Sequence, residues 1–130
     1  MLILTLRTDR PEAEIGLYED DKKLHYENWQ AHRELAETIH TKIREQLALQ
    51  ELFLQDVGGI VVFKGPGSFT GLRIGLTVLN TIAASESVPI VGELGEAWQQ
   101  KALDKLQAGN DEKIVLPFYG SDAHITKPRK

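Results

Sequence analysis

The chain has 130 residues, of which 42% are hydrophobic and 26% charged, a length and composition typical of one globular domain. Its 19 acidic and 15 basic residues leave a formal net charge of -4, which argues against a general nucleic-acid or membrane-surface binder. It contains no cysteine, which excludes a disulfide scaffold, a thiolate zinc site and a cysteine nucleophile. No apolar run could span a bilayer and the N-terminus lacks a signal peptide, so we expect a cytoplasmic protein without a membrane partner.

The first half of the chain predicts strands followed by a helix. Residues 1–6 are apolar and indicate a buried strand, whereas 13–18 and 24–29 alternate with the period of half-buried strands around a charged turn. Apolar residues on one stripe of a helical wheel predict a helix over 32–48. A short β-branched and aromatic run over 60–63 then predicts a central strand.

The second half continues the alternation. A glycine-rich turn leads into a predicted helix over 68–84, then a short strand over 89–91 and a weaker helix over 94–106. A last strand is predicted over 114–119, and the proline within it restricts that strand to an edge or an end of the sheet.

This order of elements predicts an α/β domain with one mixed sheet and flanking helices. The early strands should pair antiparallel, whereas the strands over 60–63 and 89–91, joined through a helix, should be parallel with a right-handed crossover. We expect a single lobe over residues 1–120 and a loose basic tail over 121–130.

The glycine-rich turn between a predicted strand and a predicted helix carries the most distinctive residues of the chain. These are Gly65, Pro66, Gly67, Ser68, Phe69, Thr70, Gly71, Arg73 and Gly75. Ser68 is suited to cap the helix, and the amides of such a turn can bind phosphate. The glycines miss the dinucleotide spacing and no lysine follows Gly71, so we favour a capped turn and keep nucleotide binding as an alternative.

The predicted helix over 68–84 is apolar over more than half of its circumference. The remaining strip is small and consists of Arg73, Thr77, Asn80, Thr81 and Ala84. Several apolar side chains left in water would each forgo roughly 1.5–3 kcal/mol. We therefore expect this helix to contact the sheet on one side and a second helix on the other, which is 32–48 of the same chain, a helix of a partner subunit, or both. Gly71 and Gly75, four residues apart, should let that helix approach closely.

No constellation of residues predicts a metal or a catalytic group. His32 and His40 lie too far apart around a helix to share a metal, and the chain has no His-Glu-x-x-His pattern. Ser68 has no identifiable His and Asp partners for a triad. For Arg73, both an exposed arginine and an ion pair, within the chain or across an interface, remain open.

The string Gly-Pro-Gly-Ser-Phe-Thr-Gly-Leu-Arg-Ile-Gly over residues 65–75 resembles the signature of the TsaB (YeaZ) family, and weaker similarity runs over residues 1–106. The resemblance implies an actin/Hsp70-like lobe of ribonuclease-H-like topology, without catalytic residues or a cofactor. It also implies a scaffold or activator role in the threonylcarbamoyladenosine modification of tRNA. In that family TsaB binds the transferase TsaD, an ATPase called TsaE joins the complex, and the link to tRNA is indirect.

The resemblance also implies where a partner binds. In the family the first two helices form a helical bundle with TsaD or with a second copy of TsaB. Carried onto this chain, these are the helices predicted over 32–48 and 68–84. The expected interface residues are Leu35, Ile39, Ile43, Leu72, Leu76, Thr77, Asn80, Thr81 and Ala84.

Three departures from the family pattern bear on function. The chain lacks the second lobe, and we expect a naturally short form. The opening strand of the superfamily usually ends in Asp-Thr, and here Arg7 stands at the position of that aspartate, with Asp9 two residues further on. Glu93 stands where a small hydroxyl residue is expected before the last helix. The first two departures argue against independent ATP binding. Two alternatives remain: a nucleotide-binding enzyme lobe that acts as a phosphotransferase or hydrolase homodimer, and a self-associating structural module without a tRNA link.

Overall fold

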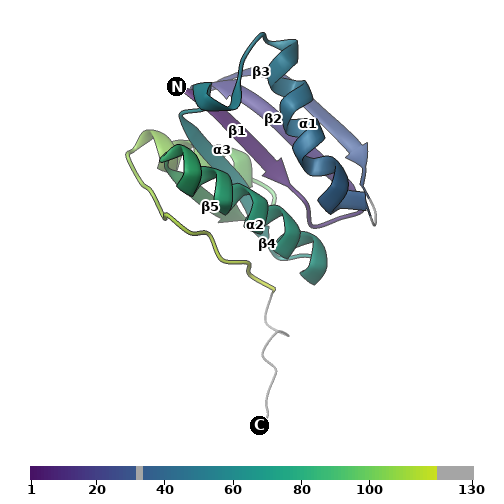
Figure 1. Ribbon diagram of the computed structural model, residues 1–130. Helices are drawn as coiled ribbons and strands as arrows, with labels where there is room; N and C mark the ends of the chain where they lie inside the picture. The colour runs from purple at the N-terminus through teal and green to yellow at the C-terminus, as the bar shows by residue number, and fades with distance from the viewer. Residues whose placement is uncertain (32–33, 120–130) are drawn as a thin grey trace.

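The structure, a computed structural model, describes residues 1–31 and 34–119, and within them five strands form one sheet (Figure 1). They are β1 (Leu2–Arg7), β2 (Glu12–Glu19), β3 (Lys22–Gln30), β4 (Gly59–Gly65) and β5 (Ile90–Leu94), in the spatial order β3-β2-β1-β4-β5. β1 to β3 pair antiparallel, and β4 runs parallel to both β1 and β5. The predicted mixed sheet is confirmed, with antiparallel pairing among β1 to β3 and parallel pairing of β4 with β5, whereas the parallel pairing of β1 with β4 was not predicted.

Helices cover both faces of the sheet. α1 (Leu35–Leu49) and α2 (Phe69–Glu86) lie on one face, and α3 (Trp98–Gln107) lies on the other (Figure 1). A short 3-10 helix, η2 (Leu54–Asp56), follows α1. The start predicted for α3 is wrong, because Leu94 still pairs in β5 and the chain then turns at Gly95, whose φ is +78°. The start predicted for α1 at residue 32 and the tail over 121–130 lie outside the described residues.

β1 is the centre of the fold, and its continuous apolar sequence has a simple cause. Leu4 and Leu6 point toward the layer of α1 and α2, whereas Ile3 points toward α3, and all three are buried. A strand covered on both faces has no solvent side on which to place polar residues. The two clusters of side chains on either face of β1 form the core.

The strand predicted over 114–119 is wrong, because this segment pairs with no strand in the described part of the chain. It lies instead along α2. The Val115 N–H donates to Asn80 Oδ1 and the Val115 carbonyl accepts from Asn80 Nδ2, both at 2.9 Å. The Phe118 N–H donates to the Lys64 carbonyl at 2.7 Å. Val115 is thereby buried in the core on the α2 side.

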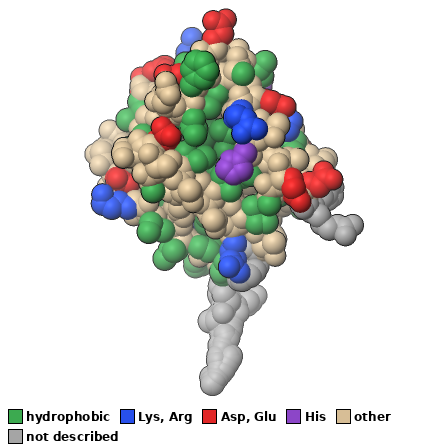
Figure 2. All heavy atoms as spheres, viewed as in Figure 1, with side chains coloured by type: hydrophobic (Ala, Val, Ile, Leu, Met, Phe, Trp, Pro, Cys, Tyr) green, Lys and Arg blue, Asp and Glu red, His purple; other side chains and the backbone are tan. Residues whose placement is uncertain are grey.

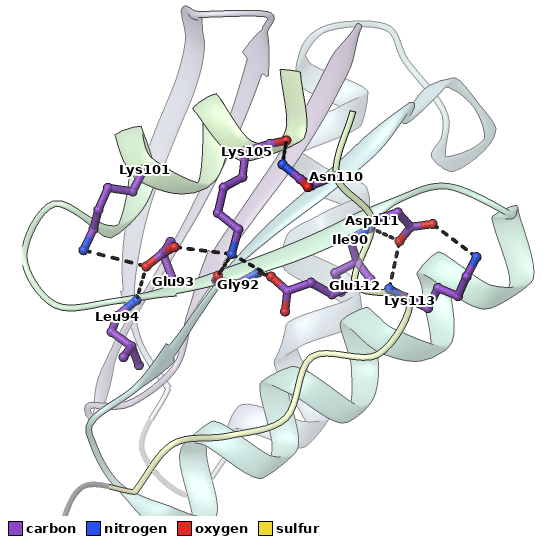
Figure 3. Close-up of polar contacts among 10 residues, drawn as sticks. All are labelled: Ile90, Gly92, Glu93, Leu94, Lys101, Lys105, Asn110, Asp111, Glu112 and Lys113. Atoms are coloured by element: carbon purple, nitrogen blue, oxygen red, sulfur yellow. Dashed lines mark hydrogen bonds and ion pairs between the residues drawn. The ribbon is translucent and has the colours of Figure 1, made fainter. Parts of the chain in front are cut away.

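Acidic side chains occupy the free edge of β5 (Figure 3). The Ile90 N–H donates to Asp111 Oδ1 at 3.1 Å, and the Gly92 N–H donates to Glu112 Oε2 at 3.2 Å. Lys105 Nζ lies 2.8 Å from Glu112 Oε2 and 3.3 Å from Glu93 Oε2, so it joins the segment to the strand. Because carboxylates bind these edge amides, the edge offers them to no further strand.

Candidate functional site

The glycine-rich turn joins β4 to α2, as predicted, and Ser68 caps the helix. The Gly71 N–H donates to Ser68 Oγ at 3.5 Å. Gly65 has a φ of +136°, and a Cβ there would lie 2.0 Å from the Phe118 carbonyl oxygen, so only glycine fits. The side chain of Phe69, also part of the predicted signature, lies outside what the structure describes.

Three glycines, one in this turn and two in the first two turns of α2, contact the connection between β1 and β2. A Cβ on Gly67 would lie 2.3 Å from the Asp9 Cβ, and a Cβ on Gly71 would lie 2.1 Å from the Thr8 carbonyl oxygen. A Cβ on Gly75 would lie 2.1 Å from Thr8 Oγ1. The expectation that Gly71 and Gly75 admit a second helix is therefore wrong, since what approaches them is the Thr8 backbone and hydroxyl.

Hydrogen bonds fix the same contact. Thr8 Oγ1 donates to the Gly71 carbonyl at 2.8 Å, and the Ser68 N–H donates to the Asp9 carbonyl at 3.2 Å. The Ser68 amide that a phosphate-binding turn would point at its ligand is thus used within the chain. The signature residues thus allow α2 and the turn before it to pack closely against the connection between β1 and β2.

Arg7 and Asp9 form a bidentate ion pair next to this contact. Arg7 Nε lies 2.7 Å from Asp9 Oδ1, and an Arg7 terminal nitrogen lies 3.2 Å from Asp9 Oδ2. The guanidinium carbon also lies 3.9 Å from the centre of the Phe63 ring. Burial alone would lower the pKa of Arg7, but the hydrogen bond and charge of Asp9 outweigh burial and raise that pKa above its usual value. Asp9 is the carboxylate nearest to the position expected for the superfamily aspartate, and its negative charge is balanced by Arg7 within the chain.

A groove runs between α1 and α2 beside the turn. Near the starts of the helices it holds a pocket of 560 Å³, which includes Thr8, Arg10, Ser68 and Thr70 in its lining. A second pocket of 380 Å³ lies between Ala36 of α1 and the α2 segment that contains Arg73 and Thr77. Both pockets include Thr70 and Ile74, so they continue into each other.

Five of the predicted interface residues face the interior of this chain. They are Leu35, Ile39, Ile43, Leu72 and Leu76, none of which is more than 4% exposed. Their apolar surface is largely covered by the sheet and by neighbouring helices, although Leu35 and Ile43 also line pockets between α1 and α2. A charge at Leu76 would enter the core and would test folding rather than association.

The other four predicted interface residues lie on the outer side of α2. Thr77, Thr81 and Ala84 are exposed, and Thr81 Oγ1 donates to the Thr77 carbonyl at 2.8 Å. Asn80 is half-buried, because it binds Val115 through both ends of its amide. The wide apolar arc of α2 is thus covered in part by α1 and in part by the Val115 segment, which the sequence reasoning did not anticipate.

A third pocket, of 620 Å³, lies at the far end of the groove and was not predicted. α1 supplies Ile43 and Leu47, η2 supplies Leu54, and α2 supplies Ile82. Beside it Leu49 and Phe53 are 63% and 70% exposed. The available signal was the apolar run Leu52-Phe53-Leu54, which lies between a predicted helix and a predicted strand and fits the period of neither.

Within residues 1–31 and 34–119, no three His, Asp or Glu side chains gather closely enough to hold a metal ion. Nor does any helix in that part of the chain have the length and apolar character needed to cross a membrane.

Comparison with known proteins gives consistent matches. The sequence family described as "TsaD: tRNA N6-adenosine threonylcarbamoyltransferase" matches residues 29–93. The Escherichia coli K12 protein named tRNA threonylcarbamoyladenosine biosynthesis protein TsaB is 26% identical over 125 residues, which cover 88% of this chain and 52% of that protein. The Haemophilus influenzae protein of the same name is 31% identical over 116 residues, covering 85% of this chain and 47% of that protein. The chain thus spans about half the length of these curated relatives.

The fold has a solved counterpart. YeaZ from Pseudomonas aeruginosa superimposes with a TM-score of 0.68 at 24% identity, over 82% of this chain and 50% of that chain. The similarity confirms the predicted lobe architecture.

Proposed function

Because this chain belongs to the TsaB (YeaZ) family, we propose that it is a non-catalytic scaffold or activator in the threonylcarbamoyladenosine modification of tRNA. It binds a TsaD-like transferase in the cytoplasm through α1 and α2, and a TsaE-like ATPase joins the complex. Its link to tRNA runs through the transferase, and residues 1–120 form the working lobe.

The packing of the glycine-rich turn on Thr8 and Asp9 is the observation that supports a non-catalytic role for this protein. The Ser68 amide and the Gly71 carbonyl are bound within the chain, and Asp9 is paired with Arg7. The Ser68 amide is a group that could bind a phosphate, and it already has a partner within the chain, so this packing supports a structural role for the signature.

The composition of the α2 surface supports the choice of binding face. Thr77, Thr81 and Ala84 are small and exposed, and Ala36 and Ala48 of α1 are exposed beside the same groove. Solvated helices usually carry long charged side chains on this side. Small residues instead let the backbone of another helix approach closely.

Association can be tested with a matched pair of variants. The full chain and the purified TsaD-like transferase of the same organism are mixed and analysed by sedimentation velocity. Thr77→Arg places a long cation on the proposed face and should weaken association about tenfold or more. Gln100→Arg makes the same change on exposed α3 and should leave association intact. Absence of association by the unmodified chain would overturn the proposal.

A nucleotide-binding homodimer is the second candidate, favoured by the 560 Å³ pocket beside the turn. Calorimetric titration with ATP and magnesium separates the two. Micromolar binding that Thr70→Val abolishes would support this candidate. Gly67→Val is unsuitable for the purpose, because a Cβ there would collide with the Asp9 side chain.

A further inference from the structure

The far end of the α1–α2 groove has the features of a docking pocket for an apolar anchor. The 620 Å³ pocket is lined by Ile43, Leu47, Leu54 and Ile82, and Phe53 stands at its rim with 70% of its surface exposed. Figure 2, viewed from the side of α1 and α2, shows hydrophobic side chains gathered at the centre of this face next to a histidine and a basic residue. Exposed aromatic and aliphatic groups around a pocket are typical of the central residues of protein interfaces.

The charges along the groove distinguish between possible occupants. The linings of the three pockets contain Arg10, Arg44, Arg73 and His40, against a single acidic residue, Glu51. Arg10 is paired with Glu14, but Arg44 and His40 have no ion pair within the described residues. This basic character is local, since the whole chain has a net charge of -4. The lining of the groove therefore complements negatively charged groups.

We propose that the pocket between the second half of α1 and η2 receives an apolar side chain from an acidic amphipathic helix of the transferase partner. An Asp or Glu of that helix pairs with Arg44 at the rim. This inference rests on the proposed function and identifies the chemistry of the partner surface.

Two other occupants fit less well. A second copy of the chain would bring the same basic side chains toward each other, which opposes self-association through this face. An RNA would gain from the arginines but would leave the apolar floor and Phe53 without a matching surface. An acidic helix with one apolar edge satisfies both features of the pocket.

Binding of the TsaD-like transferase to four variants of the full chain tests the proposal. Phe53→Ser should weaken binding about five- to thirtyfold, because it removes the exposed apolar rim of the pocket. Leu116→Ser is the matched control, since Leu116 is 72% exposed but lies on the segment beside β5 and α2, outside the pocket lining. It should bind like the unmodified chain.

Arg44→Gln should weaken binding about two- to fivefold and reduce its dependence on salt. Lys101→Gln makes the same change in charge on α3, on the opposite face of the sheet, and should alter neither. If the unmodified chain binds while Phe53→Ser and Arg44→Gln bind equally well, the pocket proposal is wrong and the proposed function stands. If the unmodified chain does not bind, both are wrong.

The same variants identify the alternative occupants. Sedimentation of the chain alone would reveal a dimer, and its loss in Phe53→Ser would make a second copy the occupant. Titration with tRNA alone, with binding lost in Arg44→Gln but retained in Phe53→Ser, would make RNA the occupant. Either result overturns the acidic-helix proposal.

Discussion

At the scale of single residues, Thr8 determines which side chains the first two turns of α2 can accept. A Cβ on Gly75 would lie 2.1 Å from Thr8 Oγ1. Gly75→Ala is therefore expected to lower the free energy of unfolding by about 1–3 kcal/mol, even though alanine has the higher helix propensity. Urea unfolding followed by circular dichroism measures this change.

A double-mutant cycle provides the control. Thr8→Ala removes the oxygen that the new methyl group would meet, so Gly75→Ala should cost less in that background. Gly71→Ala should gain no such relief, because its Cβ would meet the Thr8 backbone carbonyl, which every residue retains. Equal costs for Gly75→Ala in both backgrounds would show that Thr8 is not the obstacle.

At the scale of elements, the edge of β5 depends on ionised carboxylates. Burial opposes ionisation of Asp111, but hydrogen bonds from the Ile90 and Lys113 amides and the charge of Lys113 outweigh it, so its pKa lies below the usual 3.8. A depressed folded-state pKa means that the stabilisation is complete above the usual value and is lost as the pH falls through the folded-state value. The Ile90 amide resonance should therefore titrate with a midpoint below 3.8.

Asp111→Asn is the control for this titration, because it keeps an oxygen for the Ile90 amide and removes the ionisable group. The variant should show no midpoint at Ile90 in the acid range. A midpoint at or above the usual pKa in the unmodified chain would mean that the bond between Asp111 and the edge of β5 does not form in solution.

The elements also show what local patterns can and cannot predict. Period-two alternation predicted β2 and β3, short apolar runs predicted β1, β4 and β5, and helical patterns predicted the three α-helices, because each element buries one or both faces in the core. The segment over 114–119 has the composition of a strand, yet it pairs with none. Contacts of Asn80, Asp111 and Lys105 hold this segment in place. These contacts cross long stretches of sequence or depend on side-chain geometry, so a local pattern does not predict them.

In the candidate site, too, some features follow from local sequence and others depend on how distant segments pack. The turn and its Ser68 cap follow from local residue types. The burial of Leu35 and Leu76, by contrast, depends on which side of each helix meets the sheet and its neighbour, and a helical wheel cannot tell a core from an interface. The contact of Gly71 and Gly75 with Thr8 joins residues more than sixty positions apart, and no local pattern announces it.

At the scale of the whole molecule, a second apolar surface lies apart from the α1–α2 groove. Ile114, Leu116 and Phe118 are 64%, 72% and 45% exposed, while the backbone beside them is held by Asn80 and Lys64. Because the segment is fixed through Val115 and its backbone, the combined change of these three residues to serine should leave the melting temperature within about 2 °C. It should also reduce binding of a hydrophobic dye and leave association with the transferase unchanged. A fall of more than about 4 °C would mean that the three side chains are packed in the fold, and loss of association would place the partner on this surface instead of on α1 and α2.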